Sequence, residues 1–238
     1  MKVTTSDEIG TLAKAFNFMV GEIRKKFKLH TYVSGSTLAN IRDSDGAYSQ
    51  SIPVLREKVY RTIFFSDIRG FTRFVDSVSP DIAVSVVNEY LSLQARIIRE
   101  WGGDVDKFVG DEVMAIFSGQ DMASKALECS ARIIAVVERL KILNGYDLDI
   151  GIGLNCGYVV QGNIGSEERI DFTVIGDAVN VAARFCSHAN SGQILAGRAV
   201  YDLAMEEKCQ IALVSNGEMS LKGKPNPVAV YTVKSLST

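Results

Sequence analysis

The sequence predicts an α+β fold in which helices cover a largely antiparallel sheet. Long amphipathic helical segments are interleaved with pairs of short apolar segments that have the length and turn residues of β-hairpins. Hydrophobic residues make up 47% of the 238 residues, which is enough to bury a sizeable core. Helices interleaved with hairpins favour a helix-on-sheet sandwich over an all-helical or all-β domain.

The expected elements follow from local signals. Ser79 and Pro80 mark the start of a helix that Gly102 ends, because proline suits the first turn and glycine the C-terminal end. Gly110-Asp111 is a turn between two strands, and Gly157 is expected to break a strand pair. We expect strands at residues 59–65, 108–109, 113–117, 148–154, 159–164, 193–196, 211–214 and 228–233, and helices at 80–101, 123–140 and 178–186.

The first residues have a different pattern. Ile9, Leu12, Phe16, Met19 and Ile23 recur at alternating intervals of three and four residues, which is a heptad pattern. A short helix with so narrow an apolar stripe needs a partner for that stripe. The pattern alone fits either a coiled-coil helix or an amphipathic helix on the surface of a domain.

Composition excludes several classes of protein. The 26 basic and 28 acidic residues nearly balance, which argues against a nucleic-acid binder. No apolar run is long enough to span a membrane, and the polar N-terminus does not resemble a signal peptide. The spacings of the four cysteines match neither a C-x-x-C metal site nor a disulfide framework, so we expect reduced thiols in a cytoplasmic protein. Cys186 lies near His188, but no third group supports a thiol nucleophile.

Three segments carry residues suited to nucleotide chemistry. Asp67 follows an apolar strand, and Asp111 lies at a hairpin turn, where two carboxylates could hold divalent ions. Asn180 and Arg184 share one face of a helix, where an amide and a guanidinium suit ribose and phosphate oxygens. Each segment alone also fits an ordinary turn or a solvated helix face.

Together the segments resemble the class III nucleotide cyclases. They read F-S-D-I-R-G-F-T, then K-F-V-G-D-E-V-M-A-I-F, then T-V-I-G-D-A-V-N-V-A-A-R, in that order. The resemblance implies a ferredoxin-like, palm-type sandwich over residues 58–238. Residues 7–19 resemble the last helix of a HAMP domain, the relay that follows a transmembrane segment in bacterial receptors. We therefore expect a partial HAMP helix at 1–28, a connector at 29–57, and a cytoplasmic catalytic domain of a membrane receptor whose sensor lies outside this chain.

The resemblance implies an adenylate cyclase that works as a homodimer on ATP. By similarity, Asp67, Asp111 and the backbone carbonyl of Ile68 hold two Mg²⁺ or Mn²⁺ ions per site. Lys107 and Thr173 match the pair that reads adenine. The other residues implied at the site are Asn180 for the ribose, Arg184 for the transferring phosphate, Lys222 and Arg169 for the triphosphate, and Phe71 and Thr72 beside the nucleotide.

Three alternatives remain open at this level. Gly102-Gly103-Asp104 suggests a diguanylate cyclase, but the signature of that family is not continued by Val105. A guanylyl cyclase is disfavoured by Lys107 and Thr173. An inactive signalling module is disfavoured because every catalytic position is filled. Lys224 lies close enough to Lys222 to exchange roles with it.

Overall fold

The computed structural model describes residues 11–12, 14–20, 56–166 and 170–234. The chain divides into two compact units, Met1–Ser49 and Gln50–Thr238. In the first unit the described residues are helical, and Leu12, Phe16 and Met19 are exposed. Ile9, Ile23 and most of the expected connector lie outside the described residues. No helix in the described ranges has both the length and the apolar character needed to cross a membrane.

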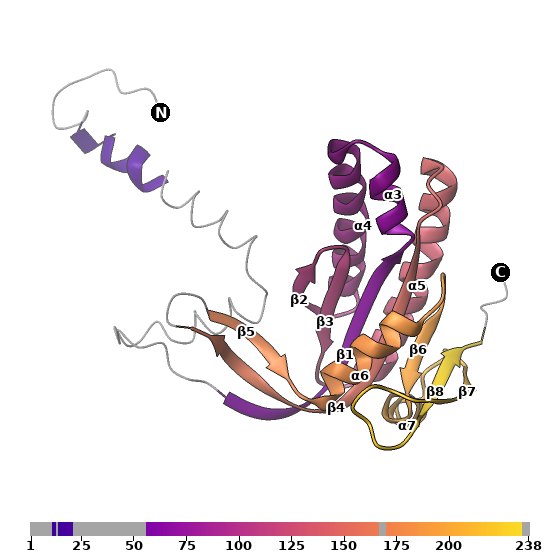
Figure 1. The fold of residues 1–238 in the computed structure, drawn as a ribbon. Coiled ribbons are helices and arrows are strands. Elements are labelled where there is room, and N and C mark those ends of the chain that lie inside the picture. Colours follow the sequence, from indigo (N-terminus) through magenta and orange to yellow (C-terminus); the bar gives the residue numbers. More distant parts are fainter. Residues whose placement is uncertain (1–10, 13, 21–55, 167–169, 235–238) are drawn as a thin grey trace. The chain divides into compact units, whose positions relative to one another are not determined.

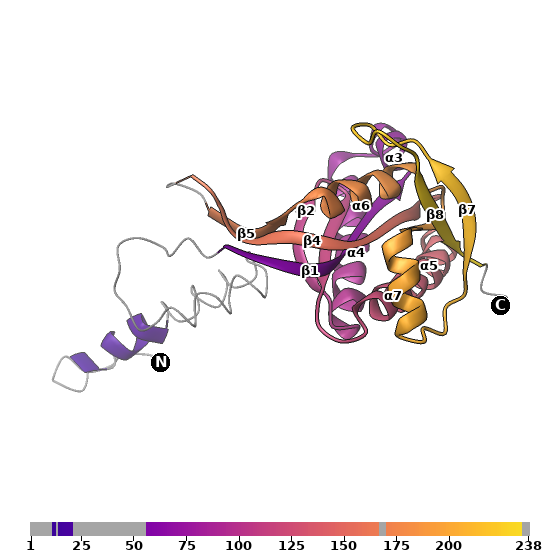
Figure 2. The ribbon, with the colours of Figure 1, turned by 90° about the horizontal axis from the view of Figure 1, so that it is seen from below.

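The second unit is built on an eight-stranded sheet, shown in Figures 1 and 2. Its order is β2-β3-β1-β4-β6-β8-β7, and β5 pairs with β4 outside this path. Every pairing is antiparallel except that of β4 with β6, so the largely antiparallel sheet is confirmed. The strands are β1 Arg56–Arg69, β2 Asp104–Val109, β3 Glu112–Phe117, β4 Asp149–Gly165, β5 Ile170–Ile175, β6 Ile194–Gly197, β7 Leu213–Met219 and β8 Val228–Val233.

Helices pack on both faces of the sheet, and β1 shows why. Phe64 packs into the cluster that includes residues of α4, α5 and α7, whereas Ile63 and Phe65 pack into the cluster that includes α6. Side chains alternate between the faces of a strand, so a continuous apolar run is buried on both sides. The helices are α3 Phe71–Ser77, α4 Pro80–Glu100, α5 Met122–Asn144, α6 Asp177–His188 and α7 Arg198–Glu206.

Local signals set the ends of the long helices. Ser79 is the N-cap of α4 and Pro80 its first residue, as the sequence predicts. Gly145 ends α5 in a left-handed conformation with φ of 70°, and its N–H donates to the carbonyl of Lys141. Glycine adopts this conformation without the steric cost that a Cβ imposes.

One expected break is wrong. β4 runs without interruption from Asp149 to Gly165 and pairs with β1 along its length. A Cβ on Gly157 would lie 2.8 Å from the side chain of Ala178. Glycine at this position therefore lets α6 approach β4 closely and does not end the strand.

Three short elements were not expected from the sequence. They are α3, β5 and α7. None of the residues of α3 is buried, and α7 buries only Val200 and Ala204. The two helices have only seven and nine residues, and β5 has six. Periodicity is hard to recognise over so few residues.

Candidate active site

Two carboxylates meet where β1 ends. Ser66 pairs with Val113 across the ladder between β1 and β3, which places Asp67 beside the turn that carries Asp111. Burial, the charge of Asp67 and a side-chain hydrogen bond with it raise the pKa of Asp111 from 3.8 to about 6. Burial and the charges of both aspartates also raise the pKa of Glu112. The end of β1 therefore concentrates negative charge.

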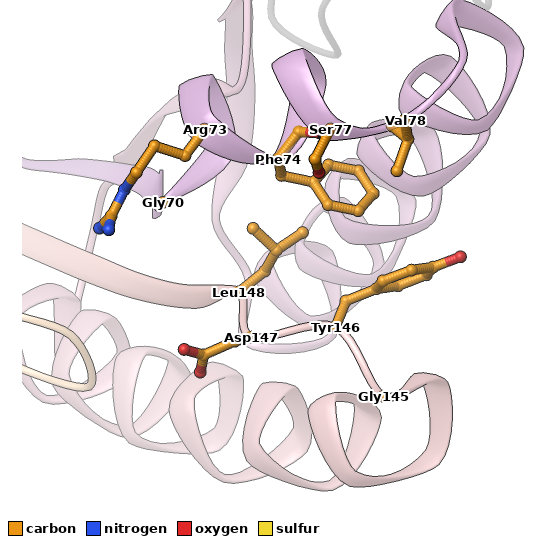
Figure 3. Close-up of a pocket in the computed structure, with 9 residues that line it drawn as sticks. All are labelled: Gly70, Arg73, Phe74, Ser77, Val78, Gly145, Tyr146, Asp147 and Leu148. Atoms are coloured by element: carbon orange, nitrogen blue, oxygen red, sulfur yellow. Dashed lines mark hydrogen bonds between the residues drawn. The ribbon is translucent and has the colours of Figure 1, made fainter.

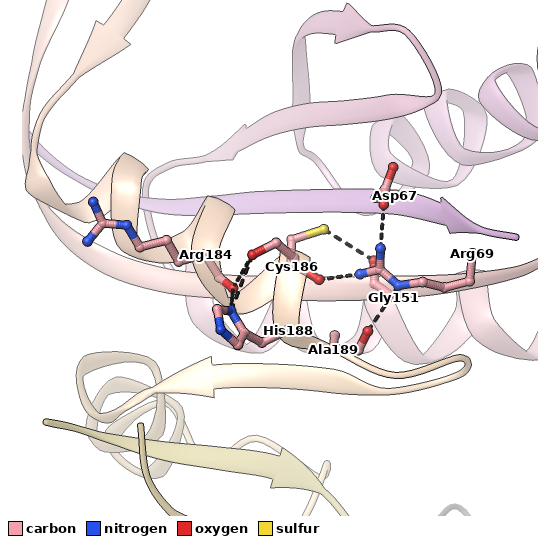
Figure 4. A network of polar contacts seen from close by, with 8 residues as sticks. Asp67, Arg69, Gly151, Arg184, Cys186, His188 and Ala189 are labelled. Carbon is pink, nitrogen blue, oxygen red and sulfur yellow. Dashed lines mark hydrogen bonds and ion pairs between the residues drawn. The ribbon is translucent and has the colours of Figure 1, made fainter. Parts of the chain in front are cut away.

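Arg69 joins Asp67 to the end of α6. Its guanidinium forms an ion pair with Asp67 and donates to the carbonyl oxygens of Cys186 and, over 2.9 Å, of Ala189 (Figure 4). These carbonyls lie at the negative end of the α6 dipole, where a cation is stabilising. A Cβ on Gly151 would collide with the guanidinium, so this glycine makes room for it. Sequence reasoning assigned no role to Arg69, although this residue lies inside the first motif.

The donor set at the end of β1 fits magnesium or manganese. Two carboxylates with mutual repulsion form a site that a divalent cation relieves. In the described ranges no group of three His, Cys, Asp or Glu side chains is placed to hold a metal. Magnesium commonly uses one or two carboxylates and takes its other ligands from phosphates and water.

Lys107 and Thr173 meet at a third residue. The Thr173 hydroxyl donates to Asp106 Oδ2 over 2.7 Å, and Lys107 Nζ lies 3.4 Å from the same oxygen. Thr173 is buried, whereas the side chain of Lys107 is 36% exposed. The two residues expected to read the base are thus brought together from β2 and β5. Sequence reasoning missed Asp106, whose adjacency to Lys107 was the available signal.

Two further residues expected at the site, Asn180 and Arg184, lie on α6. Asn180 is exposed on the first half of the helix, and Figure 4 shows the Arg184 guanidinium directed away from Asp67. Lys222 is exposed, whereas Lys224 Nζ lies 2.5 Å from Asp177 Oδ2 at the start of α6. Lys222 is therefore the better placed of the two lysines for a phosphate.

The remaining expected residues divide into three groups. Ile68 is buried in β1, and Phe71 and Thr72 open α3, partly buried and exposed respectively. Arg169 lies outside the described residues. Burial raises the pKa of the Cys186 thiol to about 12, which leaves it unreactive beside His188 at the helix end.

A cavity of about 430 Å³ lies between α3 and the segment that joins α5 to β4. Figure 3 shows Phe74, Tyr146 and Leu148 among its lining residues. None of the expected site residues lines it. The carboxylate pair and the Lys107–Thr173 pair therefore lie outside this cavity.

The fold and these two clusters define an α+β domain with the parts of a nucleotide-processing enzyme. The model of the adenylate and guanylate cyclase catalytic domain matches residues 56–235, and the chain belongs to that family. It is 28% identical to an adenylate cyclase of Anabaena cylindrica over 249 aligned positions, which cover 96% of this chain and 49% of that protein.

Solved structures agree with the fold. The adenylyl cyclase CyaB from P. aeruginosa is 32% identical with a TM-score of 0.71, covering 76% of this chain and 96% of that one. The guanylyl cyclase Cya2 is also 32% identical, with a TM-score of 0.67, covering 74% and 92%. The chain spans less than half the length of the first curated relatives it matches. The α+β cyclase fold is confirmed, and the relatives support the predicted enzyme class, an adenylate cyclase.

Proposed function

We propose that the chain converts ATP to 3′,5′-cyclic AMP and pyrophosphate. The observation that carries this proposal is the meeting of Lys107 and Thr173 at one carboxylate, in a domain that also pairs Asp67 with Asp111. A lysine donates to a ring nitrogen of adenine, whereas guanine carries an N–H at that position. The threonine oxygen complements the exocyclic amine of adenine.

Asp67, Asp111 and the carbonyl of Ile68 would hold two Mg²⁺ or Mn²⁺ ions. Such ions lower the pKa of a bound hydroxyl and neutralise a leaving pyrophosphate. The aspartates therefore act by holding and orienting these ions beside the ribose 3′ hydroxyl. The oxygen of that hydroxyl attacks the α-phosphorus and its proton passes to water. The bond from the α-phosphorus to the bridging oxygen breaks, and pyrophosphate leaves.

The residues of α6 and its surroundings would hold the nucleotide. Asn180 orients the ribose, and Arg184 stabilises negative charge on the phosphate during transfer. In other phosphoryl transfers an arginine in this role raises kcat by several orders of magnitude. Lys222 binds the triphosphate, because it is exposed and Lys224 is paired with Asp177. Phe71 and Thr72 would flank the nucleotide beside the ion site, and Arg169 would reach the phosphates.

We propose that two copies of the chain complete each site. Arg184 and Asp67 point apart within one chain, which supports a site in which one nucleotide contacts Asp67 of one subunit and Arg184 of the other. Large apolar side chains are exposed on the strands that carry the base-reading residues and on β4. They are Phe108, Val109, Tyr158, Val160, Ile170 and Ile175. A second copy would cover such a surface.

The expected receptor context rests on the first unit. Leu12, Phe16 and Met19 are exposed at heptad spacing, as a HAMP output helix requires before it meets its partner. We propose that this helix pair sets the register of the two catalytic domains. Insertions of one to four residues within residues 29–57 should then change turnover and leave the thermal unfolding of the catalytic domain unchanged. Equal turnover at every insertion length would rule this regulation out.

The activity itself is tested by incubating the protein with ATP or GTP and Mn²⁺ and measuring the cyclic nucleotides. We expect cyclic AMP from the wild-type chain and at least about a hundredfold less from Asp67→Ala. Formation of cyclic GMP from GTP in place of cyclic AMP from ATP would overturn the choice of base. A coiled coil fused ahead of residue 56 would enforce dimers. If this fusion also forms neither cyclic nucleotide, the proposal that the chain is a nucleotide cyclase is wrong.

A further inference from the structure

A β-bulge interrupts the pairing of β2 with β3 beside the base-reading residues. Val105 pairs with Ala115 and Lys107 with Met114, so Asp106 is the additional residue of the bulge. Consecutive residues of a regular strand point to opposite faces, and a bulge redirects a side chain out of that alternation. The bulge therefore allows Asp106 and its neighbour Lys107 to approach each other, with 3.4 Å between Oδ2 and Nζ.

The carboxylate of Asp106 is enclosed. Its side chain is 1% exposed, and Oδ2 accepts the hydroxyl proton of Thr173 while Oδ1 has no partner within the described residues. Burial raises the pKa of Asp106, and the hydrogen bond from Thr173 and the charge of Lys107 oppose that rise. A buried carboxylate with one unpartnered oxygen reduces stability. Residues that break a packing rule in this way are expected where they serve function.

The direction of the hydrogen bond decides what Thr173 presents to a ligand. A hydroxyl has one proton, and here that proton is directed at Asp106. The oxygen then has only lone pairs to offer, so it accepts from an amine and repels a carbonyl oxygen. Adenine carries an exocyclic amine at the position where guanine carries a carbonyl oxygen.

We propose that Asp106 is a specificity-determining residue that fixes the Thr173 hydroxyl as an acceptor and holds Lys107, so that the site selects a purine with an exocyclic amine. This inference rests on the proposed adenylate cyclase function and extends it. Asp106 acts through Thr173 and Lys107, which makes it a positioning residue.

The test is Asp106→Asn, which keeps the size of the side chain but gives it an N–H. The neutral amide is a weaker acceptor than the carboxylate and offers an N–H to Thr173 Oγ1, so the hydroxyl proton is no longer held on residue 106 and is free to turn toward the nucleotide. We expect the ratio of kcat/KM for ATP over GTP to fall by about tenfold or more. The preference for ATP over purine riboside triphosphate, which lacks the amine, should shrink by a similar factor. Asp104→Asn removes the same charge from the same strand and should leave both ratios unchanged.

A second variant separates a specific role from a structural one. Thr173→Val removes the hydroxyl and should lower the same two ratios of kcat/KM. Adding Asp106→Asn to Thr173→Val should then leave the ATP to GTP ratio as it is in Thr173→Val alone. A merely structural Asp106 would lower kcat/KM for all three nucleotides in parallel, and that result overturns the inference. Thermal unfolding of each variant shows whether it is folded.

Equilibrium binding keeps the inference separate from the proposed activity. The 3′-deoxy forms of ATP and GTP lack the attacking hydroxyl and cannot cyclise. If the wild-type chain makes no cyclic nucleotide, the proposed function fails, and the ratio of dissociation constants for these two analogues still tests Asp106. An equal ratio in wild type and Asp106→Asn overturns the role of Asp106 whether or not the chain is active.

Discussion

The guanidinium of Arg69 forms an ion pair with Asp67, two residues earlier on the same strand. The same group donates to the last carbonyls of α6, so one side chain ties the proposed ion site to the helix that carries Asn180 and Arg184. The contact connects residues that are more than a hundred positions apart in the sequence.

Loss of this connection should destabilise the domain. Arg69→Gln removes the ion pair and at least one charge-assisted hydrogen bond to α6 from a side chain that is 20% exposed. We expect the free energy of unfolding to fall by about 2 kcal/mol and Tm to fall by roughly 4–8 °C. Arg198→Gln is the matched control, because its ion pair with Asp202 lies on the exposed surface of α7 and should change Tm little. Equal shifts in both variants would contradict the role of Arg69.

The acid pair should make metal-free stability depend on pH. The pKa of Asp111 is raised to about 6 in the folded chain, so its favourable contribution is present below 3.8 and is lost as the pH rises through 6. Asp111→Asn removes the repelling charge and should raise Tm at pH 7.5 by roughly 2–4 °C, after discounting for solvent screening. The gain should vanish near pH 4. Calorimetry in the presence of a chelator measures the Tm difference at both pH values. A gain in Tm that persists at pH 4 would show that it does not arise from removing the charge of Asp111.

Adding Mn²⁺ should stabilise the wild-type chain more than it stabilises Asp111→Asn. The wild-type chain gains Tm from a cation that binds only the folded state, whereas Asp111→Asn has lost one of the proposed ligands. We expect the Tm increase on adding Mn²⁺ to be markedly smaller in the variant. The measurement needs no nucleotide and is independent of turnover. Identical increases would remove Asp111 from the proposed ion site.

α6 packs on β4 over two glycines, Gly153 and Gly157, which differ in how much space they leave for a Cβ. A Cβ on Gly153 would collide with backbone atoms of Ala182 and Cys186, the nearest at 2.1 Å. A Cβ on Gly157 would lie 2.8 Å from the Cβ of Ala178 and 3.9 Å from its Cα, which is a milder conflict. Gly153→Ala should therefore cost about 1–3 kcal/mol, and Gly157→Ala should cost less. Thermal unfolding of both variants gives the ranking. The reverse order would show that α6 is not held by its backbone contact with Gly153.

Shared sites predict complementation between inactive variants. Asp67→Ala and Arg184→Ala should each be nearly inactive, because each loses a group from both sites of the dimer. A mixed dimer has one intact site, so a statistical mixture should recover about a quarter of wild-type turnover. The assay is cyclic AMP formation after co-expression with two different tags. No recovery in purified mixed dimers would contradict sites shared between subunits.

The sequence predicted the elements whose signals are local. α4 was predicted at both ends because Ser79, Pro80 and Gly102 act within a few residues of the boundaries that they set. The continuity of β4 was not predicted, because Gly157 is accommodated by α6, an element that comes later in the chain. Tertiary packing overrides local propensity at such a position.

The same division holds at the site. The motifs singled out Asp67, Asp111, Lys107 and Thr173, and the structure brings them together in two pairs. They did not reveal Asp106, because its contact with Thr173 depends on a bulge in β2 and on the curvature of a sheet in which β3, β1 and β4 separate β2 from β5. Pairing irregularities and sheet curvature arise from contacts between distant segments.

The long ladder between β1 and β4 has a consequence for how the chain acquires its structure. Thr62 pairs with Cys156, 94 positions later, at the centre of the sheet. The helices α4 and α5 and the β2–β3 hairpin can form from neighbouring residues, but the central ladder must first close this long loop. During synthesis, as long as residue 149 is still inside the ribosome, β4 cannot pair with β1. The apolar strand β1 is then exposed with the backbone groups of one edge unpaired. The ribosome-bound intermediate is thus most vulnerable to aggregation before β4 emerges.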